Sequence, residues 1–246
     1  MISFNTEQRF VVTGASSGIG EGVALLLNKL GATVVGIGRN QERLEGMRAK
    51  SSCPGRMFLE QKDLAGDIDG LPAYVKGLKD KYGKFSGLAY CAGKTLNMPL
   101  QLKEYGISRA LFDVNYFAPM MMAKAFGDRR NTIGAGTSMV FISSVAVMLS
   151  FRAMTDYAGT KAALCASVRS AAKELAPHGI RANCILPSAI ETPMTLADPE
   201  ILAANVKSYP MGAGSPSDVA NLVAFLLSDK ARWITGHNYI VDCASF

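Results

Sequence analysis

The segment DYAGTK, residues 156–161, places a tyrosine and a lysine four positions apart. On a helix, residues at this spacing lie on one face, so Tyr157 and Lys161 can approach the same small molecule. A free phenol has a pKa of about 10, and a nearby ammonium stabilises the phenolate and lowers that pKa. The pair therefore indicates a general acid or base. A solvated helix face is the alternative, and Tyr90 and Lys94 repeat the same spacing.

A glycine-rich segment near the N-terminus, TGASSGIG at residues 13–20, is a second candidate site. It follows a short apolar strand pattern and opens a helical pattern. Glycine lets the backbone turn sharply and approach a pyrophosphate, and the N-terminus of the following helix offers free N–H groups to its charge. We therefore predict a dinucleotide site here. The expected contacts are Gly14, Ser16, Ser17, Gly18, Ile19 and Gly20.

The end of the second expected strand indicates which dinucleotide is preferred. An NAD site normally places an acidic residue there to bind the ribose hydroxyls. No Asp or Glu lies between Glu21 and Glu42 in this sequence, and the strand is followed by Arg39, Asn40 and Arg43. A guanidinium can pair with a 2′-phosphate, although both arginines could equally cover the start of a helix. We predict NADP(H), with these three residues among its contacts.

The elements that must position these groups alternate along the chain. Seven β-rich apolar segments predict strands, and the stretches between most of them have helical patterns, with one long helical region expected at 105–128. Such alternation predicts a single-domain α/β fold over residues 1–246, a doubly wound parallel sheet covered by helices on both faces. Ligands of such folds bind at the carboxyl ends of the strands, where both motifs fall. The expected strands are 9–14, 33–38, 56–61, 86–93, 137–144, 180–187 and 238–243.

Composition limits the classes of function. Hydrophobic residues make up 49% and charged residues 19% of the 246 residues, so a sizeable core is available. The net charge of +6 comes from dispersed lysines and arginines, which argues against a nucleic-acid partner. Five scattered cysteines without CxxC spacing and two distant histidines argue against a disulfide framework and a metal site.

Targeting signals are not found in this sequence. No apolar run has the length of a membrane span, and the start MISFNTEQRF lacks the charged and apolar regions of a signal peptide. The odd number of cysteines is also compatible with a reducing compartment. We therefore expect a cytoplasmic protein with no membrane partner.

Taken together, the glycine loop and the YAGTK motif resemble the short-chain dehydrogenase/reductase family over residues 9–242. Members of this family are single-domain Rossmann folds with a seven-stranded parallel sheet. They carry a catalytic Asn, Ser, Tyr and Lys. Thirteen residues before Tyr157 stands Ser144, whereas the residue at that distance from Tyr90 is Gly77. The resemblance implies the catalytic set Asn115, Ser144, Tyr157 and Lys161.

The resemblance also implies further contacts with the cofactor. Asp63 occupies the position that usually contacts adenine, and CAG stands where the family commonly has Asn-Ala-Gly. Three departures are Cys91 for that asparagine, Ser188 for a glycine, and Ser17 where many NADP-using relatives have a basic residue. The contacts implied are Asp63, Leu64, Ala92, Gly93, Tyr157, Lys161, Pro187, Ile190 and Thr192.

The function implied is NADP(H)-dependent hydride transfer between a nicotinamide and a small-molecule carbonyl or alcohol, with Tyr157 as the acid and Ser144 as a hydrogen-bond donor. The pattern is similar to 3-oxoacyl-(acyl carrier protein) reductases. A sugar or secondary-alcohol dehydrogenase and a catalytically silent NADP-binding sensor or scaffold remain alternatives. We also expect a small substrate lid around residues 192–212, and a homotetramer or homodimer, as is common among relatives.

Overall fold

Seven strands form the centre of the protein: β1 (Arg9–Thr13), β2 (Thr33–Gly38), β3 (Met57–Gln61), β4 (Gly87–Tyr90), β5 (Ser138–Ile142), β6 (Arg181–Pro187) and β7 (Asn238–Val241). They make one parallel sheet in the order β3-β2-β1-β4-β5-β6-β7. The computed structural model that shows this sheet describes residues 1–197, 206–207 and 209–245. The sheet confirms the predicted Rossmann fold, and its winding reverses between β1 and β4.

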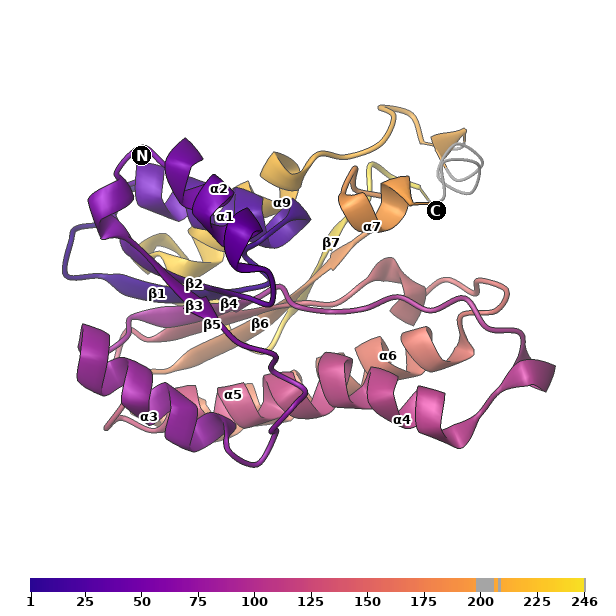
Figure 1. Cartoon of the computed structure of the whole chain (residues 1–246), viewed down its shortest axis with the longest axis horizontal. Helices are drawn as coiled ribbons and strands as arrows, with labels where there is room; N and C mark the ends of the chain where they lie inside the picture. The colour runs from indigo at the N-terminus through magenta and orange to yellow at the C-terminus, as the bar shows by residue number, and fades with distance from the viewer. Residues whose placement is uncertain (198–205, 208, 246) are drawn as a thin grey trace.

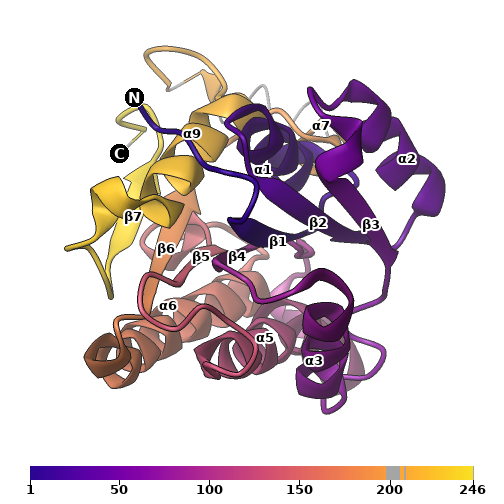
Figure 2. The same cartoon turned by 90° about the vertical axis from the view of Figure 1, so that its left-hand side faces the viewer.

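Helices cover both faces of the sheet (Figure 1 and Figure 2). One layer contains α1 (Gly18–Lys29), α2 (Gln41–Lys50) and α9 (Pro216–Leu227). The other contains α3 (Leu71–Tyr82), α5 (Ala118–Gly127) and α6 (Thr155–Leu175). Two shorter helices, α4 (Tyr105–Phe112) and α7 (Pro193–Leu196), lie near the carboxyl ends of the strands.

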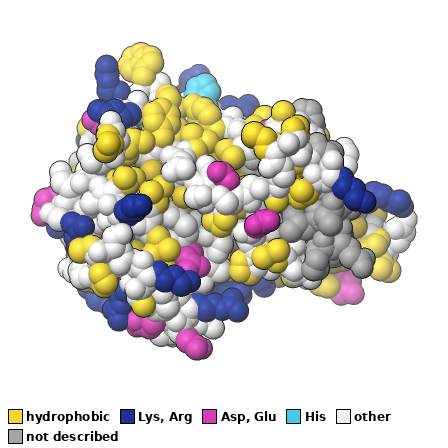
Figure 3. Space-filling view, turned by 90° about the horizontal axis from the view of Figure 1, so that it is seen from above, with side chains coloured by type: hydrophobic (Ala, Val, Ile, Leu, Met, Phe, Trp, Pro, Cys, Tyr) yellow, Lys and Arg dark blue, Asp and Glu magenta, His cyan; other side chains and the backbone are white. Residues whose placement is uncertain are grey.

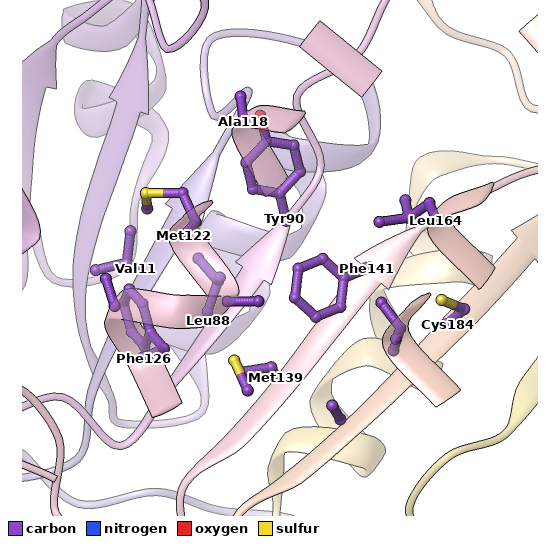
Figure 4. Close-up of a cluster of buried hydrophobic side chains, with 14 of the residues drawn as sticks. Val11, Leu88, Tyr90, Ala118, Met122, Phe126, Met139, Phe141, Leu164 and Cys184 are labelled. Carbon is purple, nitrogen blue, oxygen red and sulfur yellow. The ribbon is translucent and has the colours of Figure 1, made fainter. Parts of the chain in front are cut away.

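The alternation of side chains along each strand divides the core into two layers. In β1, Phe10 and Val12 belong to the cluster under α1 and α9, while Val11 belongs to the cluster on the opposite face. Figure 4 shows this second cluster, in which Leu88 of β4 lies near Met122 and Phe126 of α5. Burial on both faces requires apolar strands throughout, and it fixes the register that brings the strand ends to one edge.

The stretch 105–128, expected as one long helical region, is divided into α4, a π-helical turn at Asp113–Phe117 and α5. Pro119 has no N–H to donate to the carbonyl of Asn115, four residues earlier, so the α-helical ladder is interrupted there. The interruption leaves Asn115 buried, with 1% of its surface exposed. This wider turn faces the predicted site.

The surface gives two further observations. In the face seen from above, lysine and arginine side chains are scattered among acidic and apolar ones rather than gathered in one patch (Figure 3). Among the described residues, no helix is both long and apolar enough to cross a lipid bilayer.

Candidate active site

A cavity of about 270 Å³ opens at the carboxyl ends of the strands. Its walls come from the segments that follow β1, β2, β3, β4, β5 and β6. This edge, at the reversal of the winding between β1 and β4, is where open α/β sheets bind their ligands. The residues predicted from the glycine loop, from the end of β2 and from the YAGTK motif therefore meet around one space.

The glycine loop packs so closely that side chains would not fit. A Cβ on Gly14 would lie 2.9 Å from the backbone N of Ala92, and one on Gly20 would lie 2.3 Å from the carbonyl oxygen of Gly14. Gly14 also has φ +66°, in the left-handed region that favours glycine. Ser17 precedes α1 without a side-chain capping bond, so the first N–H groups of this helix remain available. This cradle fits a pyrophosphate group.

Cationic side chains line the cavity at the ends of β2 and β3. Arg39 was predicted here, whereas Lys62 was not; its backbone N donates to the carbonyl of Gly38 at 2.9 Å. Neither cation forms an ion pair with a carboxylate in the part of the chain that the structure describes. Asp63 is the only carboxylate among the lining residues. This end of the cavity is therefore positively charged and suits an anionic group.

Two predicted cofactor residues at this end do not line the cavity. The side chain of Asn40 caps α2, because its Oδ1 accepts a hydrogen bond from the backbone N of Arg43 at 2.8 Å. Arg43 is exposed one helical turn beyond Arg39. Within the described structure, Asn40 therefore has a local structural partner, and Arg43 is a neighbour of the site rather than part of its wall.

The predicted catalytic side chains converge from β5 and α6. Ser144 follows β5, accepts a hydrogen bond from the backbone N of Ala146 at 3.1 Å, and lines the same cavity as Tyr157. One helical turn after Tyr157, Lys161 is 4% exposed and places its Nζ 5.8 Å from the centroid of the Tyr157 ring. The Lys161 ammonium donates to the carbonyl of Ile142 at 2.9 Å. The spacings in the sequence thus correspond to real proximity.

Burial changes the titration of both groups. It raises the pKa of Tyr157, and the neighbouring Ser144 hydroxyl offsets only part of that rise. It also lowers the pKa of Lys161 to about 8. The net pKa of Tyr157 therefore lies above that of a free phenol, because burial outweighs the effect of its polar neighbours. The ammonium is directed at the carbonyl of Ile142, and a buried site disfavours the charged form of each group.

The Asn115 side chain does not line the cavity, but it holds in place the segment at Gly93 and Lys94, which does line it. Its Oδ1 accepts from the backbone N of Lys94 and its Nδ2 donates to the carbonyl of the same residue, both at 2.9 Å. Nδ2 also contacts Thr160 Oγ1 at 3.2 Å, which ties this segment to α6. A Cβ on Gly93 would lie 3.2 Å from Asn115 Oδ1 and 3.4 Å from Lys161 Nζ.

The segment after β6 closes the remaining side. Thr192 caps α7 in a reciprocal arrangement with Thr195, and its Cγ2 would lie 3.0 Å from a Cβ on Gly18. This contact brings the glycine loop and the start of α7 together. Of the lid expected at 192–212, residues 198–205 and 208 lie outside the described residues.

Most predicted site residues line the cavity, with the exceptions of Asn40, Arg43 and Asn115. Ser143, the residue before Ser144, lines it too, but its hydroxyl donates to the carbonyl of Lys161 at 3.1 Å and is buried. The lining residues that sequence reasoning did not assign to the site are Ile37, Gly38, Lys62, Ala65, Tyr90, Cys91, Lys94, Val114, Ile142, Ser143, Ser188, Met194 and Thr195. Many of them are direct neighbours of predicted residues, so adjacency in the sequence was the signal that could have identified them.

Comparisons with known proteins cover nearly the whole chain. The family model described as enoyl-(acyl carrier protein) reductase matches residues 14–243. D-erythrulose reductase of Gallus gallus is 35% identical over 240 residues, covering 96% of this chain and 94% of that protein. The 3-oxoacyl-(acyl-carrier-protein) reductase of Thermotoga maritima is 31% identical, with 94% and 95% covered. A solved short-chain type dehydrogenase/reductase from Mycobacterium ulcerans is 31% identical, with a TM-score of 0.89 over 99% of this chain and 91% of that one.

Proposed function

This chain belongs to the short-chain dehydrogenase/reductase family, and we propose that it is an NADP(H)-dependent oxidoreductase that transfers a hydride between the nicotinamide and a carbonyl or alcohol substrate. The observation that carries the proposal is that Ser144, Tyr157 and Lys161 line the same cavity as the glycine cradle. Members of this family bind NAD or NADP, and the cradle fits such a dinucleotide.

In the proposed reaction, a bound nicotinamide supplies the hydride for reduction. Tyr157 donates a proton to the substrate oxygen, and Ser144 hydrogen-bonds the same oxygen. The raised pKa of Tyr157 supports the role of acid, because the phenol then keeps its proton at neutral pH. Lys161 holds the nicotinamide ribose, and Asn115 positions the segment at Gly93 and Lys94. On this basis we assign Ser144, Tyr157 and Lys161 as catalytic residues, and we assign Asn115, the fourth member of the predicted set, a positioning role through Lys94.

The preference for NADP over NAD rests on charge at the ends of β2 and β3. Arg39 and Lys62 line the cavity there, and Arg43 is one helical turn further on. A 2′-phosphate would form charge-assisted hydrogen bonds with these groups, whereas an NAD site needs an acceptor for the ribose hydroxyls. The expected result is a dissociation constant for NADPH at least tenfold below that for NADH, measured by fluorescence titration.

For the substrate we favour a 3-oxoacyl thioester. The similar protein of Thermotoga maritima is a 3-oxoacyl-(acyl-carrier-protein) reductase, and Met148, Phe151 and Met194 give exposed apolar surface next to the predicted site. The alternative is a sugar or secondary alcohol, which the similarity to D-erythrulose reductase favours. We further propose a lid formed by residues 192–212 and a homodimer or homotetramer in solution.

The test is NADPH consumption with acetoacetyl thioester and, in parallel, with erythrulose, each assayed also with Tyr157→Phe. Turnover of the thioester by the unaltered protein, but not by Tyr157→Phe, supports a carbonyl reductase of the acyl branch. Turnover of erythrulose alone moves the assignment to sugars. If neither carbonyl is consumed while NADPH binds, both of these substrate assignments are overturned, and a secondary-alcohol dehydrogenase and a silent NADP-binding sensor are the alternatives that remain.

A further inference from the structure

The hydroxyl of Ser188 joins three segments that are distant in sequence. Ser188 follows β6, lines the cavity, and donates its backbone N–H to the carbonyl of Val241 at 3.0 Å. Its Oγ is 2.5 Å from the hydroxyl of Tyr209 and 3.4 Å from Oγ of Ser245. One side chain at the cavity wall therefore contacts both the segment that leads into α9 and the C-terminal turn.

The C-terminal turn is conformationally costly and is held by these neighbours. Cys243 and Ala244 have φ of 58° and 54°, in the left-handed region that residues other than glycine seldom adopt. The carboxylate of Asp242 accepts hydrogen bonds from the backbone N of Ala244 and Ser245. The Sγ of Cys243 accepts from the backbone N of Met211 at 3.0 Å. The turn and the segment 209–214 thus stabilise each other.

The same segment also returns to the cavity wall at its far end. Gly214 donates its backbone N–H to the carbonyl of Ala189 at 3.0 Å, and Glu191 donates to the carbonyl of Gly214 at 2.8 Å. Residues 209–214 therefore bracket the stretch from Ser188 to Glu191, with Tyr209 at one end and Gly214 at the other. This stretch follows β6, which pairs with β5, and Ser144 is the second residue after the end of β5. The bracketed wall adjoins the predicted catalytic groups.

We propose that the hydrogen bond between Ser188 and Tyr209 sets the position of this wall, and that Tyr209 is a positioning residue for the carbonyl substrate, acting through Ser188. The inference rests on the proposed function, because it concerns the substrate of that reaction. The contact requires the hydroxyl of Ser188, which is 2.5 Å from that of Tyr209. A substrate carbonyl must lie within a few tenths of an ångström of its productive position, and a displaced wall misaligns it.

The test combines Tyr209→Phe, Ser188→Ala and the double variant, with Tyr239→Phe as the matched control. Tyr239 is on the adjacent strand β7, and its hydroxyl makes no hydrogen bond among the described residues. We expect each single variant to lower kcat/KM for the carbonyl about three- to tenfold, mainly through kcat, because the carbonyl is misaligned. The dissociation constant for NADPH stays within twofold. The double variant should have the same kcat/KM as either single variant, because each substitution removes the same hydrogen bond between Ser188 and Tyr209. Additive losses, or no loss, would overturn the proposal.

A second readout needs no turnover. The backbone N–H groups of Met211 and Gly214 are bonded to the C-terminal turn and to the cavity wall, so their hydrogen exchange reports whether the wall is held. We expect severalfold faster exchange in Tyr209→Phe and Ser188→Ala, and no change in Tyr239→Phe. If no carbonyl is consumed by the unaltered protein, the proposed function fails, and this exchange alone decides whether Tyr209 holds the wall. Unchanged exchange refutes it.

Discussion

Replacement of Lys161 by methionine is expected to stabilise the fold while removing the proposed activity. Lys161 is 4% exposed and has no carboxylate partner among the described residues. Burial lowers its pKa from the ordinary lysine value of 10.5 to about 8. One pKa unit corresponds to about 1.4 kcal/mol, so keeping this ammonium charged at pH 7 destabilises the folded state by roughly 3 kcal/mol.

The substitution also removes a favourable contact of Lys161. Lys161 Nζ donates to the carbonyl of Ile142 at 2.9 Å, and that carbonyl would be left without this donor, at a cost of about 1 kcal/mol. The net expectation at pH 7 is a gain of about 2 kcal/mol in the free energy of unfolding. For a chain of this length, that corresponds to a rise in Tm of roughly 4 to 8 °C.

The sign of the pH dependence follows from the two pKa values. Between about 8 and 10.5 the unfolded chain still binds the proton that the folded chain has released. The wild-type protein therefore gains stability as pH rises through this window, whereas the methionine variant does not. The advantage of Lys161→Met is complete below pH 8. It shrinks toward pH 10, where the lost contact with Ile142 leaves the variant slightly less stable.

The assay is urea denaturation of both cofactor-free proteins at pH 7 and at pH 9.5, followed by circular dichroism. The single tryptophan, Trp233, is 91% exposed and would report unfolding poorly by fluorescence. Lys173→Met, at an exposed position of the same helix α6, is the matched control and should show no comparable pH-dependent gain. A variant less stable than wild type at pH 7, or a difference that does not change with pH, would refute this reasoning.

Three further predictions concern the site. Tyr157→Phe should lower kcat at least 100-fold, because the proton donor is lost, while NADPH binding measured by fluorescence titration stays within twofold. Arg39→Ala should raise the dissociation constant for NADPH about tenfold or more and leave that for NADH nearly unchanged, because only the 2′-phosphate loses a charge-assisted bond. Gly20→Ala should abolish cofactor binding in calorimetry, because its Cβ would lie 2.3 Å from the carbonyl oxygen of Gly14; wild-type affinity would contradict the packing of the glycine loop.

The strands and the order of motifs could be predicted because their signals are local. Each strand is an apolar run between turn residues, and burial on both faces demands such a run. Ser144 stands thirteen positions before Tyr157, and the stretch that joins them contains a 3-10 turn at Val145–Val147, a short loop and the first turn of α6, so the family resemblance could pair the two residues from their spacing.

Other features of the site depend on contacts that the local sequence does not specify. Lys62 reaches the cavity because its backbone bonds to Gly38 across the pairing of β3 with β2. The π-helical turn at Asn115 combines the missing N–H of Pro119 with contacts to Lys94 and Thr160 from other segments. No spacing rule includes such long-range partners, and this is why Lys62 was overlooked and the helical region was expected to be continuous.

The pKa of Tyr157 shows the same limit and bears on the direction of the proposed reaction. A tyrosine four positions before a lysine was expected to have a lowered pKa, yet burial raises the pKa of Tyr157. Burial also lowers the pKa of Lys161 to about 8 and raises that of the Cys91 thiol to about 12. The cavity thus disfavours charge on every titratable group for which a shift is resolved at this end. An alkoxide formed there would be disfavoured for the same reason, and proton transfer from Tyr157 would move its charge to the phenolate. The raised pKa keeps Tyr157 protonated at neutral pH, and this is the form that the reduction of a carbonyl requires, because only the phenol can donate the proton.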